Sequence, residues 1–89
     1  MKKKIAVLVK ERQTEALRMS IGLSLADDEV SVFIMDRKLE DGQGTAVNLE
    51  AMDAMGVRIF TNSRENNFQF MSAGDIARSL VDYDIVIPY

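Results

Sequence analysis

A continuous run of apolar residues, KIAVLV, occupies positions 4–9 of the sequence. The run is rich in Ile and Val, and its positions do not alternate between apolar and polar side chains. A strand of this composition is buried on both faces, as in a parallel sheet that helices cover on each side. The run therefore predicts an α/β fold built on a parallel sheet.

Further strand-like and helix-like segments alternate along the rest of the chain. The expected strands cover residues 4–9, 29–36, 57–60 and 85–87, and the expected helices cover residues 14–26, residues 45–55 and a segment that begins after Ser72. This order predicts right-handed crossovers and a parallel sheet with helices on both faces. The chain has 89 residues, so we expect a single domain over residues 1–89.

Local signals mark where the expected helices begin and end. Ser72 and Asp75 have the spacing of an N-cap and an N3 residue, which satisfy free backbone N–H groups at the start of a helix. Gly56 follows the second helix as a C-cap residue. The last strand, at 85–87, is expected to be buried, and Pro88 is expected to stop its pairing.

Helical periodicity predicts which side chains of the first two helices face inward. The first helix has two adjoining apolar stripes, formed by Leu17, Ile21 and Leu25 and by Ala16, Met19 and Leu23. The second helix has an apolar face formed by Val47, Ala51, Met52 and Met55, with Asn48 near its middle. The apolar arc of the first helix is wide for a lone monomer, so we expect a homo-oligomer.

The sequence contains no cysteine and no histidine. Disulfides, thiolate nucleophiles, imidazole bases, zinc sites and iron–sulfur ligation are therefore excluded. Catalysis by carboxylates, Lys, Tyr or a Ser–Lys pair stays open, but the sequence places no such groups in a convincing arrangement. We expect no catalytic residue and no metal ligand.

The charge balance excludes other classes of partner. A net charge of -3 argues against non-specific nucleic-acid binding, which requires a basic surplus. The basic run MKKK leads into five apolar residues, which are too few for a signal peptide or a membrane span. We expect a cytoplasmic protein with no nucleic-acid partner and no membrane partner.

Ligands of open parallel sheets bind at the carboxyl ends of the strands, where the connecting loops converge. The candidate ligand-binding residues at this edge are Lys10, Arg12, Asp36, Arg37, Asp41, Gly42, Asn48, Asn62, Ser63 and Arg64. The basic members could hold an anion, or all of them could be solvated loop residues. The first turn, VKERQTEA, lacks the glycines that let a backbone approach a pyrophosphate, so no nucleotide cofactor is expected.

A polar segment at residues 61–71 is longer than most connections in a compact domain. Phe68, Phe70 and Met71 crowd its end and are the candidate interface residues. The alternative is that these side chains fold back onto their own core. Asn48 is expected to face inward near Asn62, where it bonds either a ligand or a neighbouring carbonyl group.

The order and spacing of these pieces resemble the DsrE/DsrF family of small sulfur-relay proteins, which includes the TusB, TusC and TusD subunits and the YchN-like proteins. The pieces that carry the resemblance are KKIAVLV, DDEVSVFIMD, the DG at 41–42, LEAMDAMGVRIFTN and SAGDIARSLVDYDIVIPY. The resemblance implies a three-layer flavodoxin-like sheet of about four to five strands. It also implies assembly into dimers, trimers or hexamers, with copies of the chain or with DsrE-like partner subunits.

Some members of that family relay sulfur on a cysteine just after the third strand, a position that falls at or beside Asn62. An amide is not a sulfur nucleophile, so this chemistry cannot be inherited with the fold. We expect a non-catalytic DsrE/DsrF-like domain linked to sulfur metabolism, which either binds a small ligand or acts as an assembly subunit. The alternative is a small enzyme that uses Asp36, Asp41 or Lys10 as acid or base.

Overall fold

The computed structural model describes residues 3–26, 28–40 and 42–89. Five parallel strands form one sheet in the order β4-β3-β2-β1-β5. The strands are β1 (Lys4–Val9), β2 (Glu29–Ile34), β3 (Arg58–Thr61), β4 (Gln69–Phe70) and β5 (Ile85–Pro88). The helices are α1 (Gln13–Leu25), α2 (Gln43–Ala54) and α3 (Ala73–Ser79), which continues into the 3-10 turn η1 (Leu80–Asp82).

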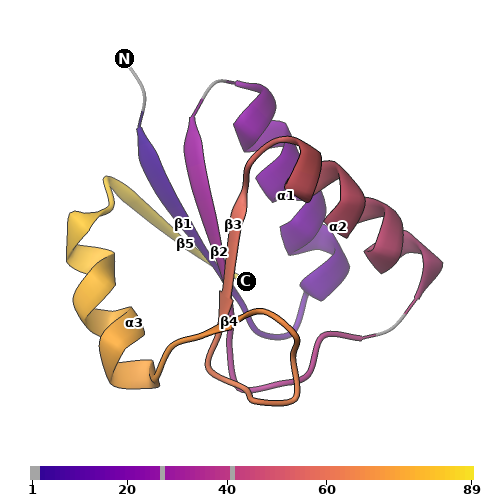
Figure 1. Ribbon diagram of the computed structural model, residues 1–89. Helices are drawn as coiled ribbons and strands as arrows, with labels where there is room; N and C mark the ends of the chain where they lie inside the picture. Colours follow the sequence, from indigo (N-terminus) through magenta and orange to yellow (C-terminus); the bar gives the residue numbers. More distant parts are fainter. Residues whose placement is uncertain (1–2, 27, 41) are drawn as a thin grey trace.

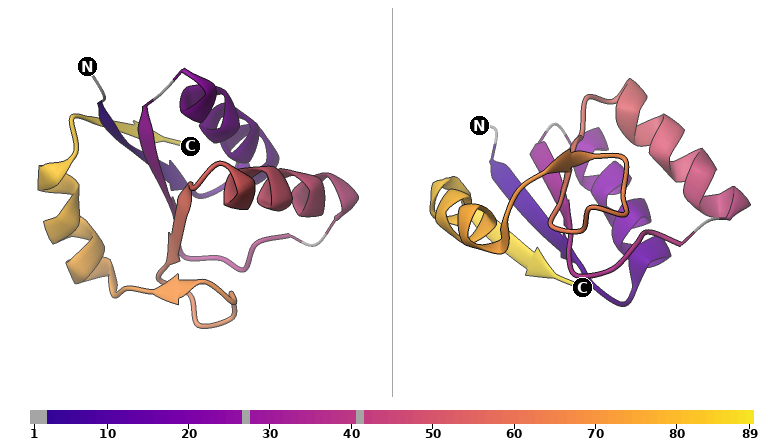
Figure 2. Two further views of the ribbon diagram at one scale, coloured as in Figure 1. Left: turned by 45° about the horizontal axis from the view of Figure 1, so that its top comes forward. Right: turned by 60° about the horizontal axis from the view of Figure 1, so that its bottom comes forward.

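The helices form a layer on each face of the sheet (Figure 1). α1 connects β1 to β2, and α2 connects β2 to β3, so the sheet grows in the same direction at both steps. Right-handed crossovers therefore place both helices on the same face. α3 leads back past β1 to β5, and the same handedness places it on the opposite face (Figure 2). The parallel sheet with helices on both faces is confirmed and is consistent with the flavodoxin-like arrangement.

The two faces of the sheet have separate cores. On the α1 and α2 face, Val7 of β1 and Val32 of β2 pack with Leu17 and Met52, and all four are fully buried. On the α3 face, the smaller core is built on Ala6, Phe33 and Ile76. Phe33 stacks on Phe60 with ring centroids 5.2 Å apart and meets Tyr83 edge to face at 5.9 Å. Burial of β1 from both sides accounts for its uninterrupted apolar sequence.

The predicted helix signals are present at the expected residues. The Ser72 hydroxyl oxygen accepts a hydrogen bond from the Asp75 backbone N–H at 3.1 Å, so α3 has the expected cap. Gly56 follows α2 with a φ of 76°, in the left-handed region that glycine adopts without a steric penalty. These local signals therefore predicted the start of α3 and the end of α2.

Part of the helical periodicity was wrong. Leu25 is 75 % exposed and Val47 is 60 % exposed, although both were expected to face inward. α1 packs against α2 as well as against the strands, and its buried face consists of Gln13, Ala16, Leu17 and Ser20. In α2 the buried positions are Thr45 and Met52. Packing between the two helices therefore rotates both inward faces away from the direction that apolar residues alone indicate.

The last strand and the long polar segment also differ from their predictions. In the part of the chain that the structure describes, β5 pairs only with β1, and its Ile85 and Val86 are 38 % and 40 % exposed, so it is an edge strand and not a buried one. Pro88 pairs with Leu8 and does not stop the pairing, because an edge strand tolerates proline. Residues 61–71 include the end of β3 and the whole of β4.

Within the described ranges, no helix combines the length and the apolar character needed to cross a bilayer.

Candidate functional site

Asp36 and Asn62 form a reciprocal pair at the carboxyl ends of β2 and β3. The Asp36 backbone N–H donates to Asn62 Oδ1 at 2.6 Å, and Asn62 Nδ2 donates to Asp36 Oδ1 at 2.9 Å. Asp36 has a φ of 66°, in the left-handed region that Asp enters more readily than most residues. The two most prominent polar candidates at this edge therefore bond each other.

Asn66 ties the long polar segment to the loop that follows β2. Its Oδ1 accepts from the Leu39 N–H at 2.7 Å, and its Nδ2 donates to the Arg37 carbonyl at 3.0 Å and to Thr61 Oγ1 at 2.9 Å. Thr61 is fully buried, and its hydroxyl donates to the Ile34 carbonyl at 2.9 Å. Three of the hydrogen bonds that an amide can make are therefore used inside the chain. We call Asp36, Thr61, Asn62 and Asn66 the carboxyl-edge cluster.

Gln13, at the start of α1, extends this bonding to a third loop. It is 6 % exposed; its Nε2 donates to the Lys38 carbonyl at 3.3 Å, and its Oε1 accepts from the Glu40 N–H at 2.9 Å. Sequence reasoning missed Gln13 and Thr61, because a polar residue at the end of a helix or strand is expected to be solvated. The only available signal was the proximity of three polar loops at one sheet edge.

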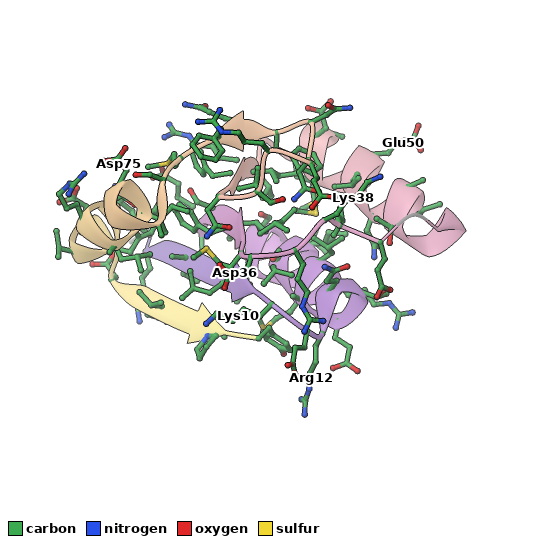
Figure 3. All side chains as sticks on the ribbon, turned by 90° about the horizontal axis from the view of Figure 1, so that it is seen from below. Lys10, Arg12, Asp36, Lys38, Glu50 and Asp75 are labelled. Atoms are coloured by element: carbon green, nitrogen blue, oxygen red, sulfur yellow. The ribbon has the colours of Figure 1, made fainter. Side chains whose placement is uncertain are left out.

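The basic candidates do not converge on a common point. Lys10, Arg12 and Arg37 are all exposed, and in Figure 3, which looks onto the carboxyl edge, Arg12 extends away from the molecule. Arg37 lies 3.9 Å from Glu11, and both side chains are mostly exposed, so this ion pair adds little stability. Arg64 lies over the Phe70 ring at 4.0 Å, a cation–π contact.

Asn48 is half-buried. It lines a shallow hollow of about 520 Å³ together with Thr14 and Arg18 of α1, and Asn62 is not among the lining residues. The structure therefore gives Asn48 and Asn62 different surroundings.

Three candidates remain. Ser63 donates its N–H to Thr61 Oγ1 at 3.1 Å, and Gly42 directly precedes α2. Asp41 lies outside the described residues.

The three candidate interface residues divide between core and surface. Phe68 packs against the core on the α1 and α2 face, and Met71 packs against the core on the α3 face. Phe70 is 38 % exposed. The long segment is therefore anchored on both sides of the sheet, and Phe70 is the member of this group that offers the most open surface.

The carboxyl edge is internally bonded. Among the residues that the structure describes, every buried side-chain nitrogen and oxygen has a hydrogen-bond partner. In that same part of the chain, no three acidic side chains gather closely enough to hold a metal ion. The geometry therefore ties three loops together through Gln13, Asn62 and Asn66.

Comparison with known proteins gives no match: no protein-family model fits the sequence, and no curated protein or solved structure shows significant similarity.

Proposed function

We propose that this chain is a non-catalytic assembly subunit of the DsrE/DsrF type. The supporting observation is the carboxyl-edge cluster, in which Asp36 bonds Asn62 and Asn66 bonds the backbone of the neighbouring loop. Side chains that bind a small ligand need free donors and acceptors that converge on it. Here the donors and acceptors hold the protein together, which favours a role in assembly over ligand binding.

The link to sulfur metabolism rests on the resemblance together with the position of Asn62. Asn62 directly follows β3. Active members of the family that this chain resembles carry their cysteine at this position. A chain with an amide at this position cannot form a persulfide there. Within a sulfur-relay complex it contributes contact surface to subunits that carry the sulfur.

A surface for self-association is available at β5. Val81, in η1, is 82 % exposed, and Ile85 and Val86, which point to opposite faces of β5, are 38 % and 40 % exposed; we call these three residues the β5 patch. β5 is an edge strand with one neighbour. Edge strands with exposed apolar side chains readily pair with another chain. We propose that copies of this chain associate through the β5 patch.

Sulfur transfer tests the non-catalytic part of the proposal. The purified protein is incubated with a cysteine desulfurase and radiolabelled cysteine, and reductant-labile label on the protein is measured. We expect no label on the natural chain, because it contains no thiol. Asn62→Cys is the matched comparison, and it should accept label if the position after β3 is accessible to a sulfur donor. Reductant-labile label on the natural chain would refute the non-catalytic role.

Sedimentation velocity tests the assembly part. At micromolar concentration we expect a mass above the 10.0 kDa of one chain. Replacing Val81 and Val86 by Lys should shift the protein to monomer, because two charges cannot be buried in an apolar contact without partners. Replacing Leu25 and Val47 by Lys is the control, since these residues are also exposed but lie on α1 and α2. A natural chain that sediments as a monomer would contradict the proposal.

A further inference from the structure

The α3 face of the sheet is covered over only part of its width. In the described part of the chain, α3 with η1 is the helical layer on this face (Figure 1). The buried Ile76 of α3 packs with Ala6 of β1 and Phe33 of β2. β3 and β4 lie beyond β2 in the sheet. Phe60 of β3 is half-buried and Gln69 of β4 is exposed, so this part of the face is open.

A hollow of about 620 Å³ occupies the open part of this face. Arg58 and Phe60 of β3 both line it, as expected of alternate residues of a strand, whose side chains share one face of the sheet. Gln69 of β4 and Tyr83, which follows η1, also line it. The lining includes no member of the carboxyl-edge cluster. The volume is in the range of sites for small molecules.

One wall of the hollow is a row of stacked rings. Phe33 of β2 and Phe60 of β3 are register partners, and their rings lie 5.2 Å apart with 20° between their planes. Gln69 of β4 is the register partner of Phe60 on the other side. Phe33 lies against one face of the Phe60 ring, so the opposite face turns toward β4, where Gln69 supplies no ring. A flat aromatic ligand continues the stack at this place.

Arg58 supplies a positive charge to the same hollow. It is exposed, and the ion pairs found among the described residues, Arg37 with Glu11 and Arg78 with Asp75, do not include it. In that part of the chain, no acidic side chain lines the hollow. A guanidinium group that no carboxylate of the protein engages can bind an anion through two parallel hydrogen bonds. The hollow therefore combines an aromatic wall with an anion-binding group.

We propose that this hollow binds a small aromatic carboxylate. The ring of the ligand stacks on the open face of Phe60, and its carboxylate accepts hydrogen bonds from the Arg58 guanidinium. Residues two apart in a strand are separated by about 6.6 Å, which a carboxylate on a short spacer and the long arginine side chain together bridge. The site uses no group of the carboxyl-edge cluster, so it does not rest on the assembly role proposed above.

The charge at this site selects among aromatic ligands. Stacking on Phe60 favours any flat ring, so the aromatic wall does not by itself distinguish an anion from a neutral molecule. Arg58 makes this distinction, because it attracts an anion and repels a cation. Lys4 adds a second positive charge near the same wall, since its Nζ lies 5.1 Å from the centroid of the Tyr83 ring. Both groups favour a carboxylate over its neutral amide.

Titration of the isotope-labelled protein with cinnamate, followed by NMR of the backbone amides, tests the proposal. The control ligand is cinnamamide, which has the same shape and no charge. We expect saturable binding of cinnamate with a dissociation constant below about 5 mM, and about fivefold weaker binding of cinnamamide. The amides of Arg58, Phe60 and Gln69 should shift, and those of Asp36 and Leu39 should not. Equal binding of the two ligands, no binding of cinnamate, or shifts centred on the carboxyl edge would overturn the proposal.

Two arginine variants test the charged contact. Arg58→Gln should weaken binding of cinnamate about fivefold and change binding of cinnamamide by less than about twofold, because it removes only the contact with the carboxylate. Arg18→Gln is the matched control, since it removes the same charge from α1, on the other face of the sheet, and should leave both affinities intact. Circular dichroism checks that both variants are folded. Equal loss of affinity in the two variants would show general charge attraction and would refute the role of Arg58.

Two phenylalanine variants test the stacked position. Phe60→Leu should weaken binding of both ligands about fivefold, because it removes the ring on which they stack. Phe70→Leu is the matched control, since Phe70 follows Gln69 in β4 and points to the opposite face; it should leave both affinities intact. Circular dichroism again checks the fold. An unchanged affinity of a folded Phe60→Leu variant would refute stacking on Phe60.

Sedimentation velocity with and without cinnamate tests whether a second copy of the chain covers the hollow instead. We expect the same sedimenting mass in both samples, because β1 and β2 separate β3 from the edge strand β5. A mass that falls toward that of one chain as cinnamate is added would mean that the hollow is an interface between copies. That result would overturn its assignment to a small ligand.

Discussion

The carboxyl edge and the edge strand β5 present opposite kinds of surface. At the carboxyl edge, Asp36, Asn62 and Asn66 bond one another and the backbone of neighbouring loops. At β5, Ile85 and Val86 are 38 % and 40 % exposed, and in the described part of the chain β1 is the strand beside it. A long polar loop is therefore not in itself a sign of a binding site. The better indication is an edge strand with exposed apolar side chains.

The largest effect is expected where the long segment enters the core. Phe68→Ala should lower the free energy of unfolding by about 3 kcal/mol, because Phe68 packs against the core on the α1 and α2 face. Phe70→Ala should lower it by less than about 1 kcal/mol, because Phe70 is 38 % exposed and loses chiefly its contact with Arg64. Urea denaturation measures both. Equal losses would mean that the two aromatic residues have the same role.

Asn66 provides the next largest effect. Asn66→Ala should destabilise the protein by about 2 kcal/mol, because it leaves the Leu39 N–H and the Arg37 carbonyl without their partner. Asn67→Ala is the matched control, since Asn67 is the exposed neighbour and should change stability by less than about 0.5 kcal/mol. The same denaturation experiment compares them. If both substitutions are neutral, the carboxyl-edge cluster is not closed in solution.

The pair formed by Asp36 and Asn62 should show a smaller coupling. A double-mutant cycle with Asp36→Ala and Asn62→Ala should give an interaction energy of about 1 kcal/mol, because each single change removes the side-chain bond between them. The bonds of this pair are exposed, so the value should stay below that for Asn66. Additive effects of the two substitutions would indicate that the pair does not form.

Several elements were predictable because their signals are local. The apolar run of β1, the Ser72 cap and the Gly56 C-cap are each read from a few adjacent residues. The position of β5 was not predictable in this way, because a right-handed crossover can add a strand on either side of β1. β4 has only two residues, which is too short to give a periodic signal.

The carboxyl-edge cluster was predictable only in part. Asp36 and Asn62 were identified as candidates because both follow strands, and the structure brings them together. The partners of Gln13 and Asn66 lie 25 to 29 residues away in the chain, and no local pattern indicates such pairs. The exposure of Leu25 and Val47 depends on how α1 and α2 pack, which periodicity within one helix does not describe.

The smallest effect on stability is expected at Glu50 and Asp53 of α2. Replacing both Glu50 and Asp53 by Lys should change the free energy of unfolding by less than about 0.5 kcal/mol, because both side chains are exposed and form none of the ion pairs of the described residues. A large loss of stability would assign these carboxylates to the fold.

Hydrogen exchange of the free protein, followed residue by residue with NMR, tests most directly whether the carboxyl edge is closed. The amides of Asp36 and Leu39 donate to Asn62 and Asn66. The Thr61 carbonyl accepts from Met71 and so points away from β2, and because strand residues alternate, the Ile59 N–H is expected to point outward too. We predict protection factors at least about tenfold higher for Asp36 and Leu39 than for Ile59. Rapid exchange at Asp36 and Leu39, together with strong protection at Ile59, would contradict the account.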